Sequence, residues 1–248
     1  MLKKIVTLIL FIATISLCLV AMLNGYPDLN RNAKTAFVPS AADGPQLKID
    51  GLTWTRVIDW RFKDGDFPGG WSWGAWRLTR GCLRGSDYTG GSSVYFFPFT
   101  HGGNVILETK VRLLQPLDET DVKVYLLTRD SEMLNYESGM VLFGHERDVA
   151  VRHMARHVEY IAEKVPAYTT IEYNTWYIMR FMIRDNLVKA FLNGTQLFAS
   201  DWHRYTGSGN TVVSQIGDFL PVGNYREPHI SVLDGTAEFE YVRIYIAN

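Results

Sequence analysis

The segment Trp176–Phe198 is the part of this 248-residue sequence that most restricts the possible fold. It reads WYIMRFMIRDNLVKAFLNGTQLF, with apolar runs separated by Asp185-Asn186 and by Asn193-Gly194. An Asn-Gly pair between apolar runs favours a two-residue hairpin, because both turn positions need positive φ and these residues tolerate it. The segment therefore predicts three antiparallel strands joined by two tight turns.

The first of these strands, Trp176–Arg184, has two different faces, because side chains alternate along a strand. One face is expected to lie in the core and consists of Tyr177, Met179, Phe181 and Ile183. The opposite face is a candidate working surface and carries Trp176, Arg180 and Arg184. The segment thus predicts the architecture and leaves the chemistry open.

Short apolar runs bounded by turn residues recur along the chain from about Gln46 onward. Such dense, short runs are typical of an antiparallel sandwich or barrel. The strands that we expect outside the opening segment are Leu52–Phe62, Trp76–Leu83, Ser93–Phe99, Asn104–Leu113, Val122–Thr128, Gly139–His145, Val212–Ile216, His229–Leu233 and Ala237–Ile246.

The segment Asp148–Lys164 fits two patterns. Its apolar residues recur at helical spacing, with Asp148 available as an N-cap and Pro166 beyond the end. The same residues also alternate as they would on strands. We favour strands here, because the all-β context overrides a local helical pattern.

The N-terminus carries an export signal. Lys3-Lys4 precede the uncharged apolar run Ile5–Leu23, an arrangement that leaves the N-terminus in the cytoplasm and exports the rest. The run is long enough to span a bilayer and lacks a good cleavage site, so a cleaved signal peptide and an uncleaved anchor both stay open. We expect a periplasmic or extracellular protein, tethered to the inner membrane by residues 5–23 if the segment is not cut.

The expected organisation is a signal peptide or transmembrane anchor at residues 1–24, a linker at 25–45 and a β-sandwich domain at 46–248. The net charge of −1 gives no electrostatic argument for a nucleic-acid partner. Cys18 and Cys82 are not expected to pair, because Cys18 lies inside the apolar run. A core of this size can do without a disulfide.

Four stretches carry a resemblance to a known superfamily. They are the hairpin Trp76–Gly85, the strand Asn104–Leu113, the segment around Trp176 with Asn193-Gly194, and the closing strand Ala237–Tyr245. In this order, from roughly Leu52 to Ile246, they resemble the concanavalin A-like lectin/glucanase superfamily, which includes laminin-G-like and 3-keto-disaccharide hydrolase-like domains. The resemblance implies an all-β fold, a jelly-roll sandwich of two antiparallel sheets, preceded here by the signal or anchor helix.

The resemblance also implies an oligo- or polysaccharide partner, but it does not identify an activity. Retaining glucanases of the superfamily carry an E-x-D-x-(x)-E pattern that points two acids from one strand into the cleft, and this chain has none. The Gln-Ile-His strand of alginate lyases is absent too, since Gly217 follows Gln215-Ile216. Glu238 and Glu240 share a face of the closing strand, where we expect solvated side chains.

Aromatic and basic residues are the candidates for carbohydrate binding. Trp71 and Trp73 lie in a Gly-rich segment and share one face of an extended chain, from which flat rings could stack on sugars. Core packing is the competing interpretation of these rings. Arg152, Arg156 and Arg180 would pair with carboxylate or sulfate groups of a glycan.

The polar cluster around His145 supplies the candidate catalytic residues. His145, Glu146 and His153 would act as general acid or base, whereas a solvated hairpin or helix face explains the same residues without chemistry. Asp64 and Asp66 are candidate ligands of a structural calcium ion, with an acidic turn as the alternative. We expect no other cofactor and no other metal site.

Three functions remain open at this point. The first is an exported carbohydrate-binding domain whose aromatic segment contacts a glycan. The second is a divergent glycoside hydrolase or polysaccharide lyase of the same fold. The third is a structural or interaction domain of the cell envelope, whose aromatic residues serve the core.

Overall fold

The computed structural model describes residues 44–64, 71–101, 104–115, 122–130, 136–144, 148–155, 158–166, 171–184, 187–201 and 225–247. The chain divides into two units, Met1–Ala33 and Lys34–Asn248, and all described residues belong to the second. The expected signal or anchor segment, residues 5–23, lies outside the described residues. Within the described ranges no helix is long and apolar enough to cross a membrane.

The described residues form strands and one short 3-10 helix, η1 (Phe62–Asp64). The strands are β1 (Gln46–Ile49), β2 (Leu52–Arg61), β3 (Trp71–Trp73), β4 (Ala75–Thr79), β5 (Cys82–Phe96), β6 (Thr100–His101), β7 (Val105–Leu113), β8 (Lys123–Asp130), β9 (Tyr136–Phe143), β10 (Asp148–Ala155), β11 (Val158–Pro166), β12 (Trp176–Arg184), β13 (Leu187–Leu192), β14 (Thr195–Asp201) and β15 (Tyr225–Ala247). The all-β prediction is confirmed.

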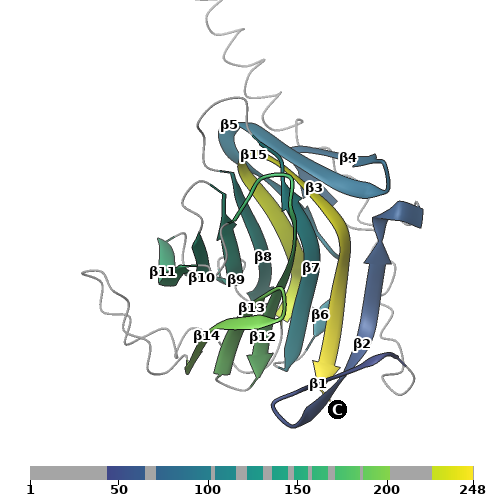
Figure 1. The fold of residues 1–248 in the computed structure, drawn as a ribbon, viewed down its shortest axis with the longest axis vertical. Coiled ribbons are helices and arrows are strands. Elements are labelled where there is room, and N and C mark those ends of the chain that lie inside the picture. The colour runs from purple at the N-terminus through teal and green to yellow at the C-terminus, as the bar shows by residue number, and fades with distance from the viewer. Residues whose placement is uncertain are drawn as a thin grey trace, which may run out of the picture. The chain divides into compact units, whose positions relative to one another are not determined.

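The strands join in one antiparallel network whose main path runs β11-β10-β9-β8-β15-β7-β12-β13-β14 (Figure 1). β15 lies at its centre and changes partners along its length. Up to Leu233 it pairs with β8 and with the second half of β5, and from Gly235 onward it pairs with β7, the first half of β5 and β2. Asp234, between the two halves, has a positive φ of 57°, and the register shifts there.

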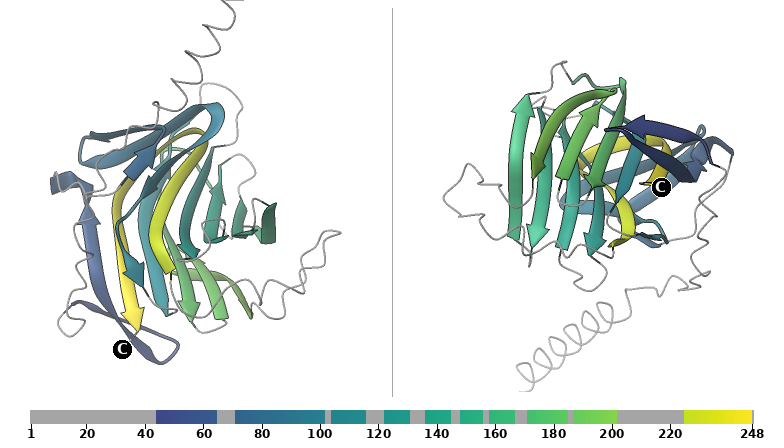
Figure 2. Two further views of the ribbon diagram at one scale, coloured as in Figure 1. Left: turned by 180° about the vertical axis from the view of Figure 1, so that it is seen from behind. Right: turned by 90° about the horizontal axis from the view of Figure 1, so that it is seen from below.

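This change of partners divides the strands into two layers. The β8 layer contains β8 to β11, the first half of β15, the second half of β5, β3 and β6. The β7 layer contains β7, β12 to β14, the second half of β15, the first half of β5, β4, β2 and β1. Both layers contribute to one large buried apolar cluster, so they face each other across it (Figure 2).

The alternation predicted for Trp176–Arg184 is confirmed. Tyr177, Met179, Phe181 and Ile183 all belong to the central cluster, and none is more than 3% exposed. Their opposite neighbours on β12 point to the outer face of the β7 layer, where Met182 joins a second, smaller cluster under the β1–β2 hairpin. The two faces of this strand therefore contact different surroundings.

Two-residue turns with positive φ at both positions close three hairpins of the described chain. They are Asp50-Gly51, Arg80-Gly81 and Asn193-Gly194. Asn193 also binds the turn to β12. Its N–H donates to the Ile178 carbonyl at 2.9 Å, and its Oδ1 accepts from the Ile178 N–H at 2.8 Å. The predicted Asn-Gly hairpin is confirmed, while the Asp185-Asn186 turn lies outside the described residues.

The ambiguous segment Asp148–Lys164 forms two strands, as we favoured. β10 and β11 pair antiparallel, with a shift of register between Val151 and Arg152. The boundaries of two other predictions were wrong. Trp76–Leu83 is not one strand but contains the Arg80-Gly81 turn, and the two strands expected near the C-terminus are one continuous strand, β15.

Candidate ligand-binding face

One row of register partners crosses the β8 layer, and its described side chains do not belong to the central cluster. The row, which we call the aromatic row, consists of Trp71 on β3, Phe96 on β5, His229 on β15, Leu127 on β8, Gly139 on β9 and Arg152 on β10. Residues directly opposite each other on antiparallel strands share a face of the sheet. The aromatic row therefore brings sequence-distant positions, including the two candidates Trp71 and Arg152, onto one line.

Two side chains of this row, Phe96 and His229, form a ring cluster with Trp73, which lies two residues beyond the row on β3. The rings of Phe96 and His229 lie 4.6 Å apart between centroids, and the Trp73 ring lies 5.3 Å from Phe96. His229 is 2% exposed, whereas Trp73 is 43% exposed. Trp73 is nevertheless held in place, because its Nε1 donates to the Ser92 carbonyl at 2.7 Å. An exposed, anchored tryptophan thus borders a buried aromatic and histidine pair.

Gly74 sets the direction of this tryptophan. It has a positive φ of 81°, and a Cβ at this position would lie 2.0 Å from Ser93 Oγ. That hydroxyl accepts a hydrogen bond from the Ala75 N–H at 3.2 Å. The break at Gly74 lets Trp73 face outward while Trp76, three residues on, packs against Tyr95 and Phe239 in the central cluster.

The remainder of this face is apolar and buried. Tyr125, Leu127, Val141 and Phe143 form a separate cluster on β8 and β9, with Leu233 packed against it. Ser231, which is register partner of both Val94 and Tyr125, is 4% exposed. We define the ligand face as the aromatic row with Trp73, Ser231 and this apolar cluster.

Two members of the ligand face were missed from the sequence. His229 and Ser231 alternate with Ile230 and Val232, which belong to the central cluster. Polar residues at alternate positions of a short apolar strand are the signal that could have pointed to them. Only the pairing of β15 with β5 shows that they lie beside the aromatic segment.

The other candidates are spread over the chain. Arg152 and His153 are described by their backbone positions on β10, and His153 lies in the neighbouring row with Ser138. Asp64 ends η1. The candidates outside the described residues are His145, Glu146, Arg156 and Asp66. Their catalytic, glycan-binding and calcium-binding roles stay predictions. Among the described residues no group of three or more His, Cys, Asp or Glu side chains could hold a metal ion.

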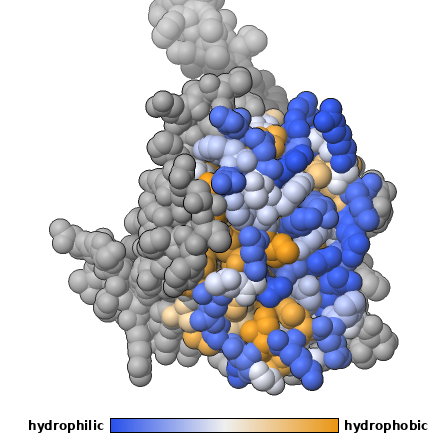
Figure 3. All heavy atoms as spheres, in the orientation of Figure 1, coloured by the Kyte–Doolittle hydropathy of each residue, from blue (hydrophilic) through white to orange (hydrophobic). Residues whose placement is uncertain are grey.

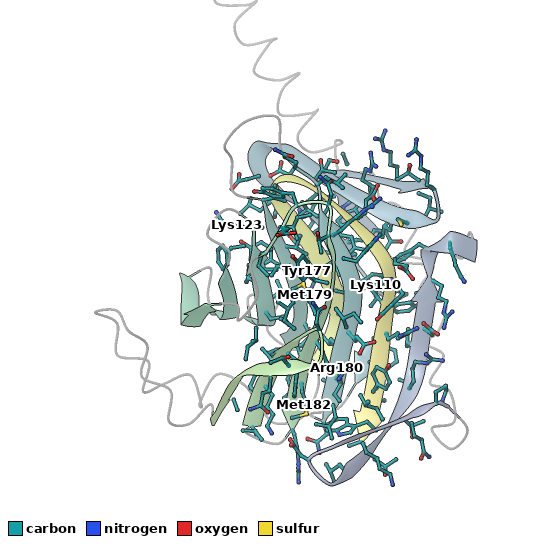
Figure 4. The ribbon with its side chains drawn as sticks, in the orientation of Figure 1. Lys110, Lys123, Tyr177, Met179, Arg180 and Met182 are labelled. Carbon is teal, nitrogen blue, oxygen red and sulfur yellow. The ribbon has the colours of Figure 1, made fainter. Side chains whose placement is uncertain are left out.

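Arg180 lies on a different surface, the outer face of the β7 layer. Its Nε and Nη2 both donate to Oε2 of Glu108, at 2.8 Å and 2.5 Å (Figure 4 labels Arg180). Arg243 Nη1 lies 3.3 Å from the other carboxylate oxygen, to which the Tyr241 hydroxyl also donates. Glu108 is therefore a buried counter-ion between two arginines, and Arg180 is not beside Trp73. We call this outer surface the ionic face.

A second buried carboxylate on the ionic face has the same arrangement. Glu238 is 2% exposed and contacts Arg84 through one oxygen and Arg112 through the other. Burial alone would raise the pKa of Glu238, but the hydrogen bonds and charges of the two arginines outweigh it and hold the pKa below its usual value. The expectation of a solvated Glu238 was wrong, because Arg84 on β5 and Arg112 on β7 flank the carboxylate and engage both of its oxygens.

Asp59 connects the same face to β2. It accepts a hydrogen bond from Arg243 at 2.9 Å and lies 3.1 Å from both Arg56 and Arg61. Burial raises its pKa, but these arginines, Arg243 foremost, lower it further than burial raises it. Arginines thus lower the pKa of both Glu238 and Asp59, which suits counter-ions better than general acids.

No known protein-family model and no curated protein sequence matches this chain. Solved structures do match. A carbohydrate-binding module, CBM66 of Bacillus subtilis, has a TM-score of 0.53 at 12% identity, with 71% of this chain and 94% of that chain covered. A galectin-like protein of unknown function from Bacillus subtilis has a TM-score of 0.57 at 11% identity, covering 77% and 96%.

A third structure extends the comparison to an enzyme. The endo-β-1,3-glucanase of Pyrococcus furiosus has a TM-score of 0.55 at 12% identity, with 82% of this chain and 98% of that chain covered. The fold is a concanavalin A-like jelly roll. Identities this low establish the fold alone.

Proposed function

We propose that this protein is a carbohydrate-binding domain that holds a glycan against Trp73, the exposed ring at the border of the ligand face. The observation that carries the proposal is Trp73, an anchored tryptophan 43% exposed at the border of the Phe96 and His229 pair. Flat rings that are held rigid bind the apolar faces of sugars with little loss of side-chain entropy. The fold, shared with a carbohydrate-binding module and a glucanase, supports the same proposal.

The chemistry of the described side chains supports binding rather than turnover. The ligand face includes a histidine, a serine and a tyrosine but no pair of carboxylates among its described side chains. Glycoside hydrolysis ordinarily requires two carboxyl groups beside the sugar. The buried acids Glu108 and Glu238 lie on the ionic face and are engaged by arginines.

We further propose that the domain acts outside the cytoplasm, carried there by the segment 5–23. Cell fractionation with and without residues 1–24 tests this step. Loss of export on removal of the segment supports it. A cytoplasmic full-length protein would contradict it, without affecting the proposal for the ligand face.

The decisive experiment compares two exposed apolar residues of neighbouring strands. Trp73 is 43% exposed and Leu78 is 40% exposed, but Leu78 pairs with Leu83 of the central cluster and so lies on the other face. A glycan array followed by calorimetry should show that Trp73→Ala weakens binding by about tenfold or more, as expected for a lost stacking ring. Leu78→Ala should bind as the wild type does.

Two results would contradict the proposal. One is unchanged glycan binding by Trp73→Ala. The other is release of sugar products from a bound polysaccharide, because that would identify an enzyme rather than a binding domain. Circular dichroism of both variants confirms that each is folded.

A further inference from the structure

The ionic face contains a row of basic residues that its own acids do not balance. Arg77 on β4, Arg84 on β5, Glu238 on β15, Arg112 on β7 and Trp176 on β12 are successive register partners. We call this line the arginine row. It crosses five strands of the β7 layer, and it is separate from the aromatic row, which crosses the β8 layer.

Glu238 is shared between two arginines. Arg84 directs Nε and Nη2 to its Oε1, while Arg112 Nε donates to Oε2 at 2.7 Å and Arg112 Nη2 lies 2.5 Å from the same oxygen. A guanidinium group has five N–H donors, so each arginine keeps donors beyond those that Glu238 uses. The Arg84 and Arg112 side chains are 25% and 33% exposed, which leaves part of each accessible to a ligand.

Arg77 increases the excess of positive charge in the arginine row. It is exposed, lies directly across from Arg84, and forms no ion pair with any residue whose side chain is described. Like charges on directly opposed strand positions destabilise a sheet. The row itself has one carboxylate for three guanidinium groups. An external anion between Arg77 and Arg84 would remove the repulsion between them.

The row is also rigid. The Arg112 guanidinium carbon lies 4.8 Å from the centroid of the Trp176 ring, and Lys110 Nζ lies 5.3 Å from the same ring. Contacts of this kind with an aromatic face fix the position of a cation. Together with the hydrogen bonds to Glu238, they hold the guanidinium groups of Arg84 and Arg112 in place before any ligand arrives, which reduces the entropy lost on binding.

The surroundings of the row are polar, with an excess of basic side chains. Hydrophilic residues predominate over β4, β5, β15 and β2 in Figure 3. Basic side chains outnumber acidic ones among the described residues of the ionic face. The basic ones are Arg56, Arg61, Arg77, Arg84, Lys110, Arg112, Arg180, Arg184, Lys189 and Arg243, and the acidic ones are Asp50, Asp59, Glu108, Glu238 and Glu240.

We propose that the arginine row binds an acidic polysaccharide through the carboxylates of its uronate residues. Guanidinium groups match carboxylates by paired, coplanar hydrogen bonds. The strands lie about 4.8 Å apart, close to the length of one sugar residue in an extended chain, so different uronates of a chain laid across the strands can reach Arg77, Arg84 and Arg112. The partly recessed arginines suit a chain lying on the sheet better than a plane of lipid headgroups.

The test measures binding of the full domain to sodium alginate at low ionic strength, with neutral dextran and phosphatidylglycerol vesicles as comparison ligands. Arg77→Gln should weaken alginate binding about fivefold, as for one exposed charged contact. Lys48→Gln removes an exposed cation from β1, away from the row, and should have no effect. Binding should disappear in high salt, because exposed charges are screened.

Arg77→Gln should also melt at the same or a higher temperature without ligand, since the change relieves repulsion from Arg84. The proposal is overturned if alginate does not bind, if Lys48→Gln weakens binding as much as Arg77→Gln, or if vesicles bind with the same dependence on Arg77. Trp73→Ala separates this proposal from the one for the ligand face, because it should leave alginate binding at the arginine row unchanged.

Discussion

Arg180 and Glu108 form a two-donor ion pair across the β12–β7 ladder, with Nε at 2.8 Å and Nη2 at 2.5 Å from the same carboxylate oxygen. The Glu108 side chain is 3% exposed and that of Arg180 is 19% exposed, so water does not replace the pair if one partner is removed. Removing one member of a buried pair leaves the other charge uncompensated. This relationship makes Glu108 one of the least replaceable polar residues of the domain.

We expect Glu108→Ala to lower the free energy of unfolding by about 3–5 kcal/mol, because Arg180 and Arg243 would lose their shared counter-ion. Denaturant unfolding followed by tryptophan fluorescence measures the change. The matched control is Glu240→Ala, which removes the partner of Lys110 from a pair whose side chains are 38% and 30% exposed. That change should cost less than about 1 kcal/mol. Equal effects of the two variants would contradict the argument.

The stability of the domain should fall as the solution becomes acidic. The pKa values of Glu238 and Asp59 are lower in the folded protein than their ordinary values, 4.5 and 3.8. At pH values near and below these ordinary pKa values, the unfolded chain therefore binds more protons than the folded one, so protonation favours unfolding. The loss of stability begins as the pH falls toward the ordinary pKa values. It is complete only below the lowered pKa values of the folded protein.

Denaturant unfolding at a series of pH values between roughly 7 and 3 measures this dependence. Glu238→Gln should be less stable than the wild type at neutral pH and should lose less stability on acidification. A variant that keeps the full acid dependence would show that other carboxyl groups are responsible.

Gly74 and Gly194 should respond differently to the same substitution. Both have positive φ, 81° and 83°, but a Cβ at Gly74 would lie 2.7 Å from Ser93 Cα, whereas nothing lies within 4 Å at Gly194. We expect Gly194→Ala to cost about 1 kcal/mol through backbone strain alone. Gly74→Ala adds a backbone clash and should cost at least twice as much, as thermal unfolding would show. Similar costs would mean that β3 moves away from β5 without penalty.

Asn193 combines a turn conformation with a side-chain hydrogen bond, and two substitutions separate these roles. Asn193→Gly keeps the positive φ and loses the hydrogen bond to the Ile178 N–H, for which we expect about 1 kcal/mol. Asn193→Ala loses both and should cost about 1 kcal/mol more. The two variants are compared by denaturant unfolding. If Asn193→Gly is as unstable as Asn193→Ala, the whole loss of stability comes from the missing side-chain hydrogen bond and none from the turn conformation.

Local sequence patterns predicted the elements that are built from neighbouring residues. The β12–β13–β14 meander follows from alternation and from the Asn193-Gly194 turn, and both signals lie within one short segment. The choice of strands for Asp148–Lys164 needed the all-β context as well, because the local pattern alone is ambiguous.

The composition of the two faces could not be predicted in the same way. Trp73 and His229 are far apart in sequence, and both rings lie beside Phe96 only because β3 and β15 both pair with β5. Glu238 is buried because β5 and β7, which are distant in sequence, place Arg84 and Arg112 on either side of it, and the register shift that follows in β15 changes which residues lie beside β7. Such shifts depend on how strands fit together in three dimensions, and a single sequence carries no local sign of them.

The membership of β15 in both layers has a consequence for how the domain folds. Until this strand is in place, β7 and β8 each lack a neighbour, so neither layer is a closed unit that could form on its own. Pairing of such sequence-distant strands is slow, and strand edges left open meanwhile promote aggregation. We therefore expect a single cooperative folding transition, in which both sheets form when β15 pairs with β7 and β8. Substitutions within β15 should then lower the yield of refolded protein more than substitutions at equally buried positions of other strands.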